Sequence, residues 1–201
     1  MIIGLTGRYC AGKNHIAAIL EKRGFPVLDV DKLGYHALEM EKQAVFAKFG
    51  YELQKNDGAL DRRLLGQKVF GRPDKLAALE EIVHPVVNRM TCEWIQSALT
   101  PNCVINAALL HKSSVFNKLE KIIIVSAPFF TRLLRARRRD KLTLTQILKR
   151  FASQKDFNTQ YLSINAEIYR IENPAFSCCG IIGSSNQKLE CRIDKIIEGI
   201  R

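Results

Sequence analysis

The stretch Gly7-Arg8-Tyr9-Cys10-Ala11-Gly12-Lys13-Asn14 directly follows the apolar run Met1-Ile-Ile-Gly-Leu-Thr6. It matches the phosphate-loop pattern G-x-x-x-x-G-K-[ST] at every required position except the last. Such a loop needs a buried strand to aim it, glycines that let main-chain N–H groups close on phosphate oxygens, and a lysine that reaches the β- and γ-phosphates. A helix must then begin at the loop, because its unpaired N–H groups and its dipole favour an anion. Residues 13–23 supply an amphipathic helix, so the stretch predicts a nucleotide-phosphate site.

The last position of the pattern is Asn14, where Ser or Thr normally offers a hydroxyl to Mg²⁺. An amide oxygen also coordinates a hard cation, so Asn14 is the candidate metal ligand. Arg8 replaces a loop position that is often glycine. It either adds charge near the phosphates or faces solvent, and the sequence does not favour one of these over the other.

The composition is that of one globular domain. The chain has 201 residues, of which 47% are hydrophobic and 25% are charged, enough for one full-sized core. The N-terminus lacks the basic region of a signal peptide, and no apolar run approaches the roughly 18 residues of a membrane span. The six cysteines show no C-x-x-C spacing and predict reduced, mostly buried thiols. We therefore expect a cytoplasmic protein without a membrane partner.

The net charge of +11 has three explanations: a polyanionic small substrate, nucleic acid, or a general surface excess. The densest basic segment, residues 132–141, places Arg132, Arg135, Arg138 and Arg139 on one helix face. A solvated helix is the usual interpretation. Four arginines on one face repel each other unless an anion or acid lies opposite, so we favour a phosphate-facing role. The chain has no recognisable RNA- or DNA-binding signature, which makes nucleic acid an unlikely partner.

Five short apolar runs are suited to strands, and helical patterns separate them. Near-continuous Ile and Val runs with intervening helices predict an α/β fold whose parallel sheet is covered on both faces. Ligands of such a sheet bind at the carboxyl ends of the strands. The predicted strands are 1–6, 26–30, 103–107, 121–126 and 177–182.

The second predicted strand ends in Asp29-Val30-Asp31, at the edge where a parallel sheet would bring it beside the phosphate loop. In an extended chain Asp29 and Asp31 point to one side, where a base or metal ligand is needed. Asp31 alternatively caps a helix that begins near Lys32. For Asp31 alone capping is the better interpretation, and the phosphate loop shifts the preference to catalysis.

The longest helical pattern covers residues 73–100, and Pro85 is expected to kink it. His84 stands immediately before this proline, which removes one backbone hydrogen bond. A lone helix histidine is usually structural or exposed. The preceding Leu60-Asp-Arg-Arg63 indicates a helix N-terminus with solvated arginines. Near the end of the chain, residues 184–200 predict an amphipathic helix that closes the fold.

Four motifs occur in order along the first half of the chain: Met1-Ile-Ile-Gly-Leu-Thr-Gly7, Pro26-Val-Leu-Asp-Val-Asp31, Leu60-Asp-Arg-Arg63 followed by Val69-Phe70, and His84-Pro85. In order and approximate spacing this set resembles the dephospho-coenzyme A kinases. Ala108-Leu109-Leu110, Arg135 to Asp140 and Ala152-Ser-Gln154 extend the resemblance. It implies one P-loop kinase domain over residues 1–201, with three α/β/α layers and a five-stranded parallel sheet. A helical acceptor-side insertion would cover about 35–100, and a lid about 132–149.

The resemblance also implies an activity. ATP would phosphorylate the ribose 3′-hydroxyl of dephospho-coenzyme A, the last step of coenzyme A synthesis, with Mg²⁺ as cofactor. Catalysis would fall to Lys13, Asp31 and Arg139. The residues implied to bind ATP are Cys10, Ala11, Gly12, Lys13, Asn14, His15, Arg135 and Arg139, and those implied to bind dephospho-coenzyme A are Asp31, Arg62, His84, Leu109 and Leu110.

The chain departs from the family pattern at several positions. Asn14 replaces Ser or Thr, Asn106 and Ala108 replace Asp and Pro, Ser126 stands where an Asp usually ends the fourth strand, and residues 177–183 lack the expected Asp-Asn pair. Two alternative functions stay open: another P-loop small-molecule or nucleotide kinase, and a non-catalytic nucleotide- or nucleic-acid-binding protein. The acceptor that stimulates ATP consumption would identify another kinase. Salt-sensitive oligonucleotide binding without phosphate transfer would identify a non-catalytic nucleic-acid-binding protein. None of these motifs specifies an oligomeric state.

Overall fold

The computed structural model describes residues 1–98, 100–140, 142–161, 164–173 and 182–200. The chain forms two compact units. One combines Met1–Leu28 with Ala98–Arg201 and carries the sheet, and the other is Asp29–Ser97 and is mainly helical.

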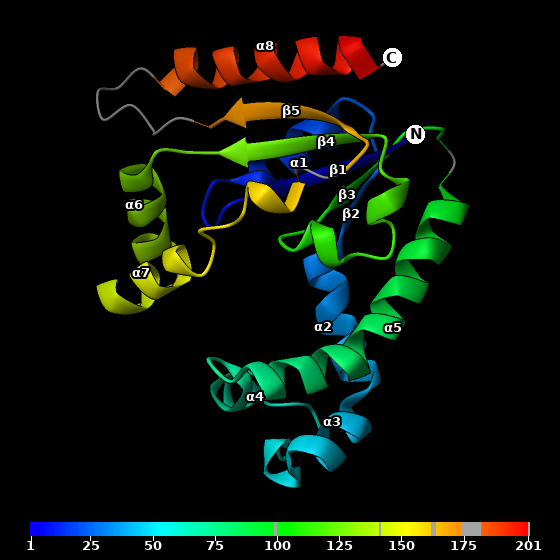
Figure 1. Cartoon of the computed structure of the whole chain (residues 1–201), viewed down its shortest axis with the longest axis vertical. Coiled ribbons are helices and arrows are strands. Elements are labelled where there is room, and N and C mark those ends of the chain that lie inside the picture. Colours follow the sequence, from blue (N-terminus) through cyan, green and yellow to red (C-terminus); the bar gives the residue numbers. More distant parts are fainter. Residues whose placement is uncertain (99, 141, 162–163, 174–181, 201) are drawn as a thin grey trace. The chain divides into compact units, whose positions relative to one another are not determined.

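The first unit is built on a five-stranded sheet in the order β2-β3-β1-β4-β5 (Figure 1). Strand β1 pairs in parallel with β3 on one side and with β4 on the other, and β4 pairs in parallel with β5. The prediction of a five-stranded parallel sheet is confirmed. The strands are β1 Ile2–Gly7, β2 Val27–Asp29, β3 Cys103–Asn106, β4 Lys121–Ser126 and β5 Glu167–Glu172.

The fifth strand lies elsewhere than predicted. Residues 177–181 of the predicted strand lie outside the described part of the chain, and Ile182 begins helix α8, Ile182–Ile200. Strand β5 is instead the charged sequence Glu-Ile-Tyr-Arg-Ile-Glu. Strand β5 is an edge strand that pairs only with β4 in the described sheet, so it needs less apolar surface than a central strand.

Alternate residues of the strands form a core on one face of the sheet. Ile3 and Leu5 of β1, with Ile123 and Val125 of β4, pack against helix α1, Lys13–Lys22, and against α8. Helix α8 buries Leu189, Ile193 and Ile197, as its amphipathic pattern predicted. This packing fixes β1 and α1, the two elements that the phosphate loop connects.

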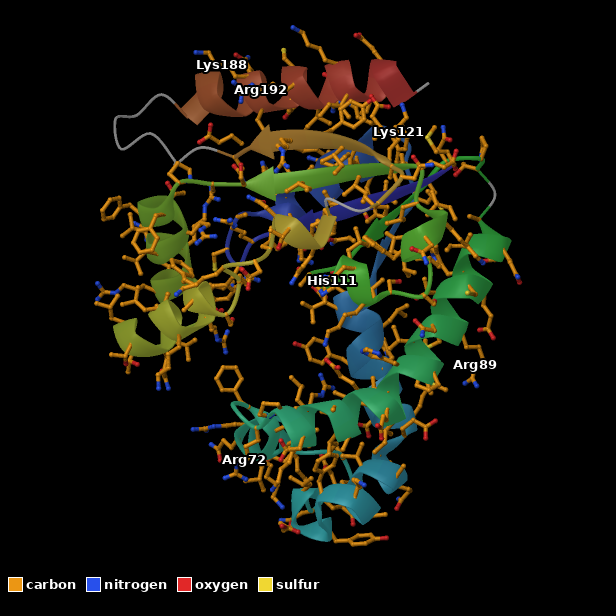
Figure 2. All side chains as sticks on the ribbon, viewed as in Figure 1. Arg72, Arg89, His111, Lys121, Lys188 and Arg192 are labelled. Carbon is orange, nitrogen blue, oxygen red and sulfur yellow. The ribbon has the colours of Figure 1, made fainter. Side chains whose placement is uncertain are left out.

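The opposite face carries short 3-10 helices: η2 Leu110–Lys112, η3 Phe116–Lys118 and η4 Thr159–Tyr161. Tyr161 is buried here, with its ring against those of His111 (labelled in Figure 2) and Phe116. Its hydroxyl lies 3.3 Å from Oγ1 of Thr6 on β1. The even-numbered residues of β1 therefore face a different environment from the odd-numbered ones.

The second unit contains four helices and one 3-10 turn among its described residues: α2 Val30–Met40, α3 Lys42–Phe49, η1 Tyr51–Leu53, α4 Arg62–Val69 and α5 Pro73–Ser97. Helix α5 contains Pro85, as predicted, and its ribbon changes direction along its length (Figure 1). Val83, Val86 and Val87 of α5 pack with Ala37 of α2. No helix in the described part of the chain is long and apolar enough to cross a membrane.

Candidate active site

The phosphate loop has the backbone that the sequence pattern requires. Gly12 has a φ of 94°, in the left-handed region, and α1 begins at the next residue. Cys10 also has a positive φ, of 60°. The N–H of Ala11 donates to the carbonyl of Arg8 at 2.9 Å, which closes the loop on itself. Strand β1, loop and helix α1 therefore follow in the predicted order, and the start of α1 offers an electropositive helix end to an anion.

Three polar side chains form a network at the start of α1. The Nζ atom of Lys13 donates to Oδ1 of Asn14 at 3.2 Å and to Oδ1 of Asn106 at 3.1 Å. Nδ2 of Asn106 donates to the same Asn14 oxygen at 3.1 Å. Asn106 is buried at the carboxyl end of β3. The ammonium group thus contacts two amide oxygens at the start of α1, the position from which a phosphate-loop lysine reaches nucleotide phosphates.

The same network contains the candidate metal ligand. The side-chain oxygen of Asn14 is of the type that Mg²⁺ prefers, and it accepts hydrogen bonds from Lys13 and Asn106. No cluster of three or more His, Cys, Asp or Glu side chains suited to a metal occurs within the described ranges. This donor set suits an ion held mainly by nucleotide phosphates and water, with one ligand from the protein.

Asn173 directly follows β5 and contacts the main chain of the phosphate loop. This residue was not predicted from the sequence. Its side chain is only 6% exposed, and Nδ2 donates to the carbonyl of Ala11 at 2.9 Å. Arg135 donates to that carbonyl at 3.1 Å and to Oδ1 of Asn173 at 3.4 Å. A Cβ atom added to Gly12 would lie 2.2 Å from Nδ2 of Asn173, so glycine is also required there by close approach. The carbonyl of Ala11 thus accepts hydrogen bonds from two side chains outside the loop.

Replacing this amide tests the support. We expect Asn173→Asp to weaken ATP binding about tenfold, because it exchanges the N–H donor for a carboxylate that faces the Ala11 carbonyl. Titration of ATP by calorimetry measures the change. Asn117→Asp, at an exposed position of η3, is the matched control. An Asn173→Asp protein with unchanged ATP affinity would show that the loop holds its shape without this contact.

The predicted lid, about 132–149, overlaps helices α6, Phe129–Asp140, and α7, Leu144–Ala152. Ala136 and Ile147 of these helices pack against Cys10 of the loop. The four predicted arginines do not share one environment. Arg132 is buried, with its guanidinium 4.3 Å from the centre of the Phe151 ring, and burial lowers its pKa. Arg138 is exposed. The shared phosphate-facing role is therefore not seen for Arg132.

The remaining two arginines lie near the loop. Arg135 donates to the carbonyls of Cys10 and Ala11, as described for Asn173. The side chain of Arg139 is 61% exposed and donates two hydrogen bonds to Asp140, at 2.6 and 3.0 Å. Its guanidinium also lies 5.3 Å from the centre of the Tyr9 ring. Because Arg139 is exposed, a phosphate group of ATP can compete with the Asp140 carboxylate for its guanidinium.

Tyr9 and Asp140 connect the loop to the lid helices. The Tyr9 hydroxyl donates to Asp140, and the Tyr9 main-chain N–H donates to the side chain of Gln154 at 2.7 Å. Arg150 of α7 lies 3.7 Å from Asp140. The guanidinium of Arg139, followed by the hydrogen bond from Tyr9, lowers the pKa of the Asp140 carboxyl. Burial raises the pKa of the Tyr9 hydroxyl, which keeps it protonated as the donor.

This lowered pKa predicts a pH dependence of stability. The Asp140 side chain is 18% exposed, so we expect Asp140→Asn to reduce the free energy of unfolding by about 1–2 kcal/mol at pH 7. A carboxyl with a lowered folded-state pKa stabilises the protein above its unfolded value, about 3.9, and loses that effect as pH falls through the folded-state pKa. The difference between the two proteins, from urea unfolding, should therefore shrink below about pH 4. A difference that is the same at both pH values would exclude the charge as its source.

In the second unit, Asp29 and Asp31 have different surroundings. Asp29 caps α2, because its carboxylate accepts from the N–H of Lys32 at 3.2 Å. Asp31 lies in the first turn of α2 and is exposed. The expectation that both lie in extended chain on one side is wrong, since β2 ends at Asp29. Capping is therefore the role of Asp29, and the catalytic role of Asp31 stays a prediction.

The other predicted acceptor-side residues lie on helices and turns. Arg62 is exposed at the start of α4, with its guanidinium 5.0 Å from the centre of the Tyr35 ring. His84 is half-buried on α5. In the first unit Leu109 is 50% exposed, whereas the side chain of Leu110 is completely buried. A Cβ atom on Gly4 would lie 2.6 Å from Cδ2 of Leu110. Leu110 therefore packs in the core, and in this conformation its side chain does not offer a surface to substrate.

Comparison with known proteins shows the family of the chain. A family model described as CoaE, dephospho-CoA kinase, matches residues 1–168. The chain belongs to the dephospho-CoA kinase family. The dephospho-CoA kinase of Treponema pallidum (strain Nichols) is 32% identical over 94% of this chain and 92% of its own. That of Shouchella clausii (strain KSM-K16) is 36% identical over 77% of this chain and 81% of its own.

A solved structure supports the same family fold. TT1252 from Thermus thermophilus has a TM-score of 0.80 and 30% identity, and the match covers 100% of this chain and 98% of that one. Enzymes of the dephospho-CoA kinase family are ATP-dependent kinases that transfer phosphate to an alcohol group. The predicted resemblance, which had been carried mainly by the first half of the chain, is confirmed.

Proposed function

We propose that this chain transfers the γ-phosphoryl group of ATP to the ribose 3′-hydroxyl of dephospho-CoA, giving CoA and ADP. The observation that carries the proposal is the phosphate loop with its lysine held at the start of α1, in a chain of this family. The C–O bond of the ribose is untouched. The new bond joins the 3′-oxygen to the γ-phosphorus, the bond from that phosphorus to the bridging oxygen of ADP breaks, and the hydroxyl proton passes to a base.

The residues of the loop would bind the nucleotide. Main-chain N–H groups of the stretch from Cys10 to His15 would donate to the phosphates, and Gly12 provides the turn. Lys13 would leave the amide oxygens of Asn14 and Asn106 for the β- and γ-phosphates and stabilise the charge on the transferred group. Arg135, which already supports the loop, and Arg139 would close over ATP, exclude water and counter negative charge.

The second unit would supply the acceptor side. Asp31 is the proposed base, and in the reacting complex its carboxylate must lie about 2.6–3.2 Å from the 3′-oxygen or reach it through one water. Arg62 and His84 would donate hydrogen bonds to the phosphates or ribose of dephospho-CoA. Leu109 would contact that substrate, and Leu110 would position the segment from the core. Residues of about 35–100 would thus act as the acceptor-side insertion of a single kinase domain, with about 132–149 as its lid.

Mg²⁺ is the proposed cofactor, and Asn14 would hold it together with the phosphates of ATP. When bound, the ion neutralises phosphate charge and orients the γ-phosphoryl group. The side chain of Asn14 must then give up hydrogen bonds from Lys13 and Asn106, which frees Lys13 for the nucleotide. We propose a cytoplasmic location, where ATP is available.

The acceptor decides between the proposed function and the nearest alternatives. We expect dephospho-CoA to stimulate ADP release by the purified protein, whereas shikimate and nucleoside monophosphates leave the rate at its background. Stimulation by one of the other acceptors instead would assign a different small-molecule kinase. Salt-sensitive binding of an oligonucleotide with no stimulation by any acceptor would favour the non-catalytic alternative.

A further inference from the structure

We propose that a cavity on the face of the sheet opposite α1 binds a small ligand carrying phosphate groups, at a site that shares Arg8 with the phosphate loop but does not include Lys13 or the start of α1. The cavity has a volume of about 260 Å³. Arg8, Ser126 and Arg170 contribute its polar lining, and Phe157 and Asn158 also line it. The proposed function does not require this site, so the inference goes beyond it.

The alternation of side chains along the strands places these groups together. Gly7 pairs with Val125, and Arg170 pairs with Ile124. Ile3, Leu5, Ile123, Val125 and Ile171 belong to the core beneath α1 and α8. Successive side chains of a strand point to opposite faces of the sheet, so the even-numbered Ser126 and Arg170 lie on the face opposite this core. Arg8 is the even-numbered residue that directly follows β1, and it continues the same alternation. Arg8 and Arg170 flank β4, on chains about 10 Å apart, a span that two arginine side chains can close around one ligand.

The lining of the cavity contains two arginines and no acidic residue. Within the described residues, neither Arg8 nor Arg170 has a salt-bridge partner. Glu172 shares the parity of Arg170 on β5, but it does not line the cavity. Arg8 also repels the buried Arg132 of α6, which adds to the lowering of the Arg132 pKa by burial. Two arginines in a lining without an acidic residue repel each other, and a bound anion would reduce this repulsion.

The lining fits a phosphate-bearing ligand in particular. A guanidinium presents paired N–H groups that match phosphate oxygens, and two of them suit a doubly or triply charged group. The Ser126 hydroxyl and the Asn158 amide can bind further oxygens, while Ile124 and Phe157 provide an apolar wall. Arg8 is the only one of these lining residues that belongs to the phosphate loop. An anion here would sit on the side of the sheet that α1 does not cover.

Pyrophosphate is the probe, and the phosphate loop is blocked first. We expect calorimetric titration of pyrophosphate into protein saturated with ADP to show one binding event. Arg170→Gln should weaken it at least tenfold. Arg192→Gln, which removes an exposed arginine from α8 (labelled in Figure 2), should leave it unchanged. The Lys13→Ala protein should retain the same event without ADP, because Lys13 does not line the cavity.

Each outcome is decisive. Loss of the event in Arg170→Gln and in Arg8→Gln, with both proteins folded by thermal unfolding, supports the cavity. If Arg170→Gln does not fold, Arg8→Gln alone decides. No event in ADP-saturated protein, or equal affinity in the arginine variants and Arg192→Gln, would overturn the proposal. These titrations contain no dephospho-CoA, so their failure leaves the proposed kinase activity untouched, and a failed kinase assay leaves them untouched.

Discussion

The Asp31→Asn protein is expected to bind ATP normally and to lose its kinase activity. The substitution keeps the size of the side chain and removes the carboxylate that would accept the 3′-hydroxyl proton, so we expect kcat to fall by about 10²- to 10⁴-fold. Asp31 is exposed in the first turn of α2 and does not cap that helix. Thermal unfolding of the variant separates a loss of chemistry from a loss of the fold. Steady-state rates of CoA formation, with ATP affinity from calorimetry, measure both parts.

The neighbouring carboxylate provides a matched control. Asp29 caps α2, and Asn caps a helix about as well as Asp. Asp29→Asn thus removes a charge two residues away while it preserves the cap, and we expect its turnover to stay within a few-fold of the wild type. If Asp31→Asn is as active as Asp29→Asn, Asp31 is not the base.

Loss of the loop lysine should have an effect of similar size on a different step. Lys13→Ala removes the ammonium group that would stabilise charge on the transferred phosphoryl group, so we expect kcat to fall by about 10²- to 10³-fold. ATP affinity should fall as well, because the same group binds the ground-state phosphates. Asn14 and Asn106 still bond to each other in this variant, which should preserve the fold. Rapid-quench measurement of ADP formation separates the chemical step from binding.

Lys22→Ala tests whether charge on α1 alone explains such a loss. Lys22 is exposed in the last turn of the same helix, far along it from the phosphate loop. We expect this variant to keep its turnover and its ATP affinity. Equal losses in the two lysine variants would point to a general charge effect and would remove the specific role of Lys13.

The first four strands and the phosphate loop could be predicted because their signals are local. Strands β1, β3 and β4 are mostly buried runs rich in apolar residues, β2 is a short strand within the predicted range 26–30, and the loop pattern fixes its own turn. Strand β5 gave no such signal, because Glu167, Arg170 and Glu172 interrupt its apolar residues. A search for apolar runs therefore preferred residues 177–182. Ile171 belongs to the core and Arg170 lies on the opposite face, and this alternation follows only from the pairing of β5 with β4.

The same distinction between local and distant signals applies to the site residues. The roles of Lys13 and Gly12 follow from a contiguous motif, whereas Asn173 acts on Ala11 across a sequence separation of 162 residues. Asn173 directly follows β5 at the ligand edge of the sheet, but this position could not be recognised because the fifth strand was predicted at residues 177–182. The capping residue of α2 was also misjudged, because the length of β2 decides whether Asp29 or Asp31 takes the cap, and β2 has only three residues.

The most direct test is mass-spectrometric detection of CoA after the purified protein is incubated with ATP, Mg²⁺ and dephospho-CoA. Fragmentation of the product places the new phosphate on the 3′-position. We predict CoA from the wild-type protein and at least about 100-fold less from Lys13→Ala and from Asp31→Asn in the same incubation time. No CoA from folded protein that binds ATP would contradict the proposed reaction.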